Sequence, residues 1–329
     1  MPTFLTTPKM APALAARVER SVTRKPSHAS ARAMRPRAAV HLVTMVRFGV
    51  PLAIAAMVGT VVHFVRQDRL ELERARASLI DTVRTESASL TPDDLAKVPL
   101  VASWLSRLSG AYDGDVVDDG LRAPGALDAV LARPTIYVRG PLGSFGTTAS
   151  VAEVAAASSK DALARCLLSP PASRTEKAVL GTVLTTHGGG DALGAHLHRL
   201  DDAEVILPLL QPAWAEGVRQ APDLESVMRQ RRQLDKTPVE RGVPTLKAGQ
   251  LLAVMDEPSH GGPTELDGEG PHDVRIALVD LVGGKVLLRL RRHVDPSWIS
   301  SGKRPMYAAA LDGCLLAIDT RDAVSGAAK

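Results

Sequence analysis

The stretch VRIALVDLVGGKVLLRLRR, residues 274–292, decides the fold class of this 329-residue chain. Two runs rich in valine, isoleucine and leucine flank Gly283-Gly284, a two-residue turn of the kind found in tight hairpins. A slip of one residue would move every side chain to the opposite face, so the apolar pattern specifies one register. The stretch therefore predicts an antiparallel hairpin, with Ala277, Val279 and Leu281 opposite Leu290, Leu288 and Val286.

Working outward from the hairpin, further strands are predicted at 135–138 and 250–255, and a final helix at 305–320. Helical patterns fill most of the chain before residue 250, beginning with a capped start at Thr91-Pro92. Because the helices come first and the strands gather at the end, the order favours an α+β domain. This domain is expected over 91–323, followed by a disordered C-terminus over 324–329.

An apolar run, FGVPLAIAAMVGTVVHFV at 48–65, lies between Arg47 and Arg66 and contains no Asp, Glu, Lys or Arg. As a helix it would span about 27 Å, close to the hydrocarbon thickness of a bilayer. Alternatives are a buried core helix and the apolar part of a cleaved signal peptide. We predict a single N-terminal transmembrane helix over 43–66.

The basic character of the chain is concentrated before this run. The first 47 residues hold nine Lys/Arg and one acid, a net charge of +8, so the remainder carries −4 of the total +4. A nucleic-acid-binding domain would carry its basic surface on the folded part, which excludes nucleic acid as the expected partner. We predict a disordered basic tail over 1–42.

The tail also suggests an orientation, because positive residues favour the cytoplasmic side and anionic lipid. The chain has no asparagine and uses arginine more than lysine, which is typical of a GC-rich bacterial genome. The expected location is the bacterial inner membrane, with the lipid bilayer as a partner. The N-terminus would be cytoplasmic and the C-terminal domain periplasmic, although equal numbers of basic residues flank the run.

Residues 67–90 continue as a charged helical pattern with a thin apolar stripe of Leu72, Ala75, Leu79 and Val83. Two heptads are fewer than the about three to four that identify a coiled coil. We interpret the segment as a helical stalk that offers a surface for self-association or for a protein partner.

The two cysteines, Cys166 and Cys314, both begin Cys-Leu-Leu runs inside helical patterns. An oxidising compartment would allow a disulfide between them. In a reducing compartment both would be buried, inert thiols. The sequence leaves both alternatives open.

The loop over 256–273 contains the densest group of possible metal ligands. Carboxylates and imidazoles that converge bind divalent cations or zinc, and long loops in compact domains often carry function. The alternative is a solvated polar loop, since no spacing fixes the ligands. The candidate ligands are Asp256, Glu257, His260, Glu265, Asp267, Glu269, His272 and Asp273.

No catalytic residue and no cofactor other than this possible divalent metal is assigned. We hypothesise a membrane-anchored extracytoplasmic binding or assembly module of unknown ligand. The alternative is a membrane-tethered, metal-dependent hydrolase that uses the loop over 256–273.

Overall fold

A computed structural model describes residues 37–146, 151, 153–155, 158, 162–188, 196–237, 239–258 and 270–326. The chain divides into two compact units, 1–68 and 69–329, and each is described by itself. Helix α2 (Arg37–Ser87) begins in the first unit and ends in the second. Helix α2 begins at Arg37, so residues 37–42 are helical although the sequence predicts them as the end of a disordered tail.

The first unit corrects the predicted membrane span. Among the described residues, no helix combines the length and the apolar composition needed to cross a membrane. The helix that contains the apolar run continues past it with the charged residues Arg66, Asp68 and Arg69. The predicted transmembrane helix over 43–66 is therefore wrong, and so are the inner-membrane location and the orientation that rested on it.

The second unit is a mixed α/β domain built on one open sheet, which confirms the predicted α+β content but not an antiparallel sheet throughout. The described strands follow the order β1-β6-β5-β4-β2-β3. β2 pairs in parallel with both β3 and β4, whereas β4, β5, β6 and β1 pair antiparallel. The strands are β1 (Val116–Val117), β2 (Thr135–Pro141), β3 (Leu197–Arg199), β4 (Gln250–Asp256), β5 (His272–Asp280) and β6 (Lys285–Val294).

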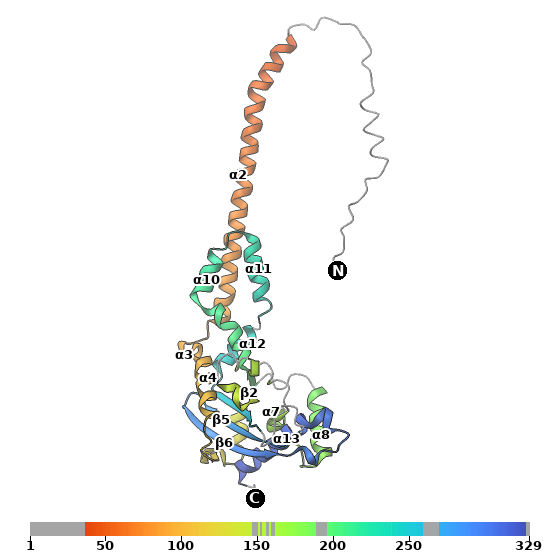
Figure 1. Cartoon of the computed structure of the whole chain (residues 1–329). Coiled ribbons are helices and arrows are strands. Elements are labelled where there is room, and N and C mark those ends of the chain that lie inside the picture. The colour runs from red at the N-terminus through yellow and green to blue at the C-terminus, as the bar shows by residue number, and fades with distance from the viewer. Residues whose placement is uncertain are drawn as a thin grey trace, which may run out of the picture. The chain divides into compact units, whose positions relative to one another are not determined.

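Both faces of the central sheet are buried because helices cover each of them. Successive residues of β4 alternate between the two cores, with Leu251 and Ala253 in one and Leu252 and Val254 in the other. One layer contains the end of α2 with α4 (Lys97–Leu108), α9 (Leu200–Ile206), α10 (Pro212–Arg219), α11 (Leu224–Leu234) and α12 (Val239–Lys247). The other contains α5 (Ala126–Leu131), α7 (Leu163–Leu168), α8 (Glu176–Gly188) and α13 (Arg304–Ser325), the last three grouped together in Figure 1.

The hairpin forms where the sequence predicts it, but its register differs. Ile276 lies opposite Leu290 and Leu278 opposite Leu288, and an irregularity follows before Asp280 pairs with Lys285. The turn contains four residues, 281–284. The Asp280 carboxylate stabilises it by accepting the backbone N–H groups of Val282 and Gly283 at 3.0 and 2.9 Å. The two faces of the hairpin contribute to different cores, and the predicted pairing of Ala277, Val279 and Leu281 with Leu290, Leu288 and Val286 is wrong.

The segment expected to form a stalk is part of the domain core from residue 69 onward. Leu79 and Val83 are 1% and 4% exposed, and Leu72 and Ala75 pack against the same core. Arg76 also donates a hydrogen bond to the Ala221 carbonyl. The apolar stripe therefore faces its own chain, whereas Glu73, Arg74 and Asp81 between its members are exposed.

Short helices connect the remaining parts of the domain. At Thr91 the expected helix start is present, since Asp94 N–H donates to the Thr91 hydroxyl at 3.3 Å and Thr91 N–H to the Asp94 carboxylate at 2.8 Å. These capped residues form α3 (Pro92–Leu95), and the 3-10 helices are η1 (Asp119–Leu121), η2 (Leu142–Phe145), η4 (Leu207–Leu210) and η5 (Pro296–Trp298).

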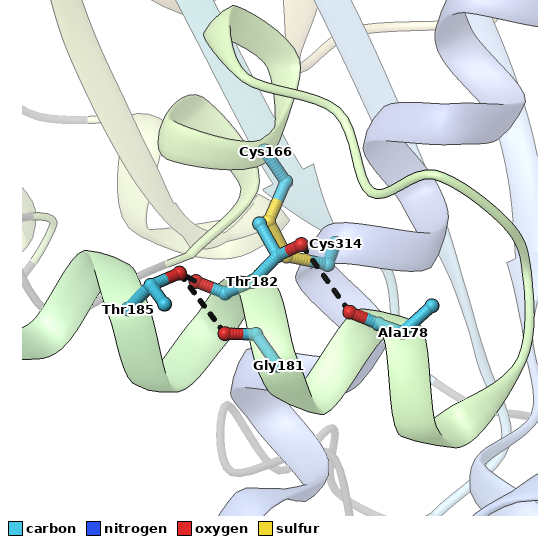
Figure 2. The surroundings of a disulfide bond; sticks show 6 residues. All are labelled: Cys166, Ala178, Gly181, Thr182, Thr185 and Cys314. Atoms are coloured by element: carbon cyan, nitrogen blue, oxygen red, sulfur yellow. Dashed lines mark hydrogen bonds between the residues drawn. A yellow bond between two sulfur atoms is a disulfide. The ribbon is translucent and has the colours of Figure 1, made fainter.

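A disulfide joins Cys166 of α7 to Cys314 of α13 within the second core. Figure 2 shows it beside α8, whose Thr182 and Thr185 hydroxyls donate to carbonyls of their own helix at 3.2 and 2.9 Å. Both cysteines are completely buried. The cross-link holds together two helices that lie 148 residues apart in the chain.

Candidate functional site

The strand order places a candidate site at the carboxyl ends of β2 and β4. From β2 the chain passes to β3 on one side, and it later returns to β4 on the other side. In open α/β sheets, ligands bind where connections leave neighbouring parallel strands in opposite directions. Arg139 and Asp256 lie at this position, near the end of β2 and at the end of β4.

Arg139 and Asp256 form a buried two-point ion pair. Arg139 Nε and Nη2 lie 3.2 and 2.9 Å from the two carboxylate oxygens, and the residues are 8% and 0% exposed. Burial raises the pKa of Asp256, but the Arg139 charge and hydrogen bonds from His272 and Arg139 outweigh it and hold the pKa below its usual value. The pair therefore stays ionised inside the protein.

His272, the first residue of β5, extends the pair. Its Nε2 lies 3.5 Å from Asp256 Oδ1, and its Nδ1 lies 2.9 Å from the Gly270 carbonyl oxygen. A carbonyl accepts only, so Nδ1 carries a proton in this arrangement. Burial lowers the pKa of His272, whereas the contacts with Asp256 and the Gly270 carbonyl raise it, and the net shift is upward.

Asp312, in the middle of α13, is another buried acid. Its Oδ1 accepts the indole N–H of Trp298 at 2.9 Å. Its Oδ2 has no hydrogen-bond partner among the described residues, although the side chain is only 2% exposed. Burial raises the pKa of Asp312 to about 6, and Trp298, His272 and Arg139 counteract part of that shift.

The backbone around Arg139 is held tightly from the other side of the sheet. Ser158 Oγ accepts the Arg139 N–H at 2.8 Å and lies 2.7 Å from the Val154 carbonyl. A Cβ atom at Gly140 would come within 2.4 Å of Val154 Cγ1, so only glycine allows this approach. These contacts fix the end of β2 and hence the position of the Arg139 side chain.

The remaining described metal candidates form ion pairs with basic residues. Glu257 contacts Arg275 and lies 2.5 Å from Arg291, and Asp273 lies 3.0 Å from Arg291 and 2.8 Å from His293. His260, Glu265, Asp267 and Glu269 lie outside the described residues.

Within the part of the chain that the structure describes, no three His, Cys, Asp or Glu side chains gather as a metal site would require. The proposed ligands at 256, 257, 272 and 273 are instead divided between two clusters, one around Arg139 and one around Arg291.

Sequence reasoning missed Arg139, Asp312 and Trp298. Arg139 follows directly on the predicted strand at 135–138, and Asp312 interrupts the apolar pattern of the final helix between Leu311 and Cys314. A charged residue on the buried face of an apolar helix or strand is the signal that could have identified both.

Comparison with protein-family models, with curated proteins and with solved structures found no match to this chain.

Proposed function

We propose that this chain is a binding module whose ligand site is the polar cluster of Arg139, Asp256, His272 and Asp312. The observation that carries the proposal is the Oδ2 atom of Asp312, a buried acceptor without a partner among the described residues. Leaving such an atom unpaired costs about 1–3 kcal/mol, which a hydrogen-bond donor on a ligand would recover.

The surroundings of Asp312 support a binding role. Acids with perturbed pKa values cluster at functional sites, and burial raises the pKa of Asp312 while the charges of His272 and Arg139 act against the shift. The position at the carboxyl ends of two parallel strands is the one that ligands occupy in open α/β sheets. Trp298, which covers Asp312 Oδ1, is itself only half-buried, so the cluster lies one side chain below the surface.

The same contacts favour binding over catalysis. Asp256 is fully engaged by Arg139 and His272, and the imidazole of His272 has a partner at each nitrogen. A general base needs a free lone pair that reaches substrate. In this cluster the free lone pairs belong to Asp312 Oδ2, which suits recognition of a hydrogen-bond donor.

The test is a screen of small polar fragments by ligand-observed NMR, comparing the wild-type chain with Asp312→Asn. This substitution keeps an acceptor for Trp298 and replaces the free acceptor with a donor. The control is Asp319→Asn, on the same helix, whose side chain pairs with Arg174 at 2.5 Å. We expect fragments that bind the wild-type and the control but not Asp312→Asn; equal binding to all three proteins would refute the site.

A second candidate function is assembly with another copy of this chain through helix α2. Large apolar side chains between 52 and 65 are 47–75% exposed, far above what an unpartnered soluble helix carries. Four of them, Ile54, Val58, Val61 and Val65, follow the alternating spacing of four and three that pairs identical helices.

Sedimentation of the wild-type and of a Val58→Glu/Val61→Glu double variant tests this assembly. A short seam predicts a weak dimer that dissociates on dilution and is lost in the variant. A wild-type chain that stays monomeric at high concentration, or that binds uncharged lipid vesicles through the same residues, would exclude self-assembly as the role of this surface.

A further inference from the structure

The outer edge of strand β6 is covered by β1 over only part of its length. β1 pairs with β6 at two positions, opposite Arg289 and Leu288. The chain departs from the ladder just before β1, where Gly114 has a φ of 95°, a backbone conformation that favours glycine. Among the described strands, only β5 lies beside residues 290–294 of β6. A strand edge that is open in this way can pair with a strand of another chain.

At Arg291, the next outward-facing position of this edge, two side chains take the place of a strand. Asp115 Oδ1 accepts the Arg291 N–H at 3.0 Å, and Arg292 Nη1 donates to the Arg291 carbonyl at 2.7 Å. The same Nη1 lies 2.7 Å from Asp115 Oδ2, so the two side chains also form an ion pair. A neighbouring strand would bond to the same two backbone groups. The ion pair therefore occupies the donor and the acceptor through which the ladder would continue.

The segment that carries Asp115 is held against the sheet by its neighbours. Tyr112 donates a hydrogen bond to Asp115 Oδ1, and its ring centroid lies 5.6 Å from the guanidinium carbon of Arg289. Arg289 Nε also donates to the Gly114 carbonyl at 2.9 Å. The side chains of Asp115 and Arg292 are 46% and 23% exposed, so a strand that arrives from solvent would meet this ion pair.

We infer that Asp115 and Arg292 guard the β6 edge against pairing with the same edge of a second copy of this chain. Two such edges are self-complementary, because an antiparallel pair about a two-fold axis bonds the same groups of each strand. Charged side chains protect the sheet edges of many proteins in the same way. Removing Asp115 alone would leave the Arg292 charges of the two copies close together, and like charges oppose pairing. Removing both side chains therefore opens the edge most fully.

The test uses full-length wild-type protein and an Asp115→Ala/Arg292→Ala double variant. The control is Asp119→Ala/Arg122→Ala, which removes an exposed Asp–Arg pair of 3.7 Å at helix η1. Each double variant removes one acid and one base, so the net charge of the chain stays the same. Association through helix α2 would be present in all three proteins and does not affect the comparison.

The measurement is hydrogen exchange of the Arg291 amide, followed by mass spectrometry at residue resolution. At low protein concentration, this amide should exchange about tenfold or more faster in the Asp115→Ala/Arg292→Ala variant than in the wild-type, because its acceptor is gone. At an about hundredfold higher concentration its exchange should slow again as two edges pair. The wild-type and the control should show no dependence on concentration. Slow exchange in the buried strand β4 shows that each protein is folded.

Three results would overturn the inference. Equal exchange of the Arg291 amide in the wild-type and in Asp115→Ala/Arg292→Ala at low concentration would show that Asp115 does not occupy this group. Fast exchange in the same variant at both concentrations would show that the opened edge does not pair with a second copy. A control that behaves like this variant would show that the effect does not belong to the ion pair at the edge.

Discussion

The pH dependence of stability offers the sharpest prediction, and Asp312→Asn is the perturbation that reveals it. Burial raises the pKa of Asp312 from its usual 3.8 to about 6. The hydrogen bond from Trp298 and the charges of His272 and Arg139 act against this shift, while Asp295 adds to it.

The sign follows from proton binding. An acid whose pKa is raised by folding binds its proton more tightly in the folded protein, so protonation stabilises the fold. The stabilisation is complete below pH 3.8 and is lost as the pH rises through about 6. A shift of about two units corresponds to a loss of about 3 kcal/mol in the free energy of unfolding. Asparagine does not titrate, so the variant should lack this loss.

The measurement is urea unfolding of both proteins between about pH 4 and pH 8, followed by circular dichroism. Asp256 and His272 titrate in both proteins, so the difference in unfolding free energy isolates Asp312. We expect the two proteins to approach each other at low pH and the variant to become the more stable one by about 3 kcal/mol above pH 7. A difference that is independent of pH, or that favours the wild-type at high pH, would refute the burial argument.

Three further predictions follow from the described contacts. Asp256→Leu alone should cost about 3–5 kcal/mol because it removes the carboxylate that balances the buried charge of Arg139, whereas adding Arg139→Met should restore most of the loss; chemical denaturation of the two single variants and the double variant checks this coupling. Replacing Cys166 and Cys314 together with alanine should lower the unfolding free energy by up to about 5 kcal/mol, given the long loop between them, and unfolding with and without reductant should show the same loss in the wild-type. Gly140→Ala should cost about 1–3 kcal/mol, seen as a lower melting temperature, because its methyl group would come within 2.4 Å of Val154 Cγ1; an unchanged temperature would refute this steric argument.

Local chemistry explains which parts of the fold could be predicted. The strands at 135–138 and 250–255, the hairpin strands and the final helix follow from apolar periodicity and turn residues, which act over a few positions. The Thr91 cap is equally local, since its two hydrogen bonds connect residues three apart. These elements are present close to their predicted bounds.

Long-range pairing explains why the hairpin register and the parallel strand pairs were not predicted from the sequence. The hairpin register depends on the neighbouring strand β4. Just before β4, the Gly249 carbonyl accepts the Leu281 N–H at 2.8 Å, so Leu281 belongs to the turn, which is longer than the predicted two residues. The parallel pairing of β2 with β3 and β4 has no signal in the strands themselves. A buried apolar run is compatible with either direction of pairing.

The candidate site depends on tertiary structure even more strongly. The acidic loop over 256–273 correctly drew attention to Asp256 and His272, but their partners Arg139 and Asp312 come from a strand before it and a helix after it. The loop alone left a metal site and a solvated polar loop as alternatives. The guanidinium that occupies the carboxylate of Asp256 is visible only once β2 lies beside β4.

By itself, the amino-acid sequence determined the longer strands, the final helix, the mixed α/β content and the separation of a basic N-terminal region from a mildly acidic domain. Periodicity, capping and turn chemistry are properties of neighbouring residues, so they can be read along the chain. The tertiary structure alone decided the strand order, the burial of the 72–83 stripe and the meeting of Arg139, Asp256, His272 and Asp312. These outcomes depend on which distant segments share a core, and that choice is made by packing the whole domain.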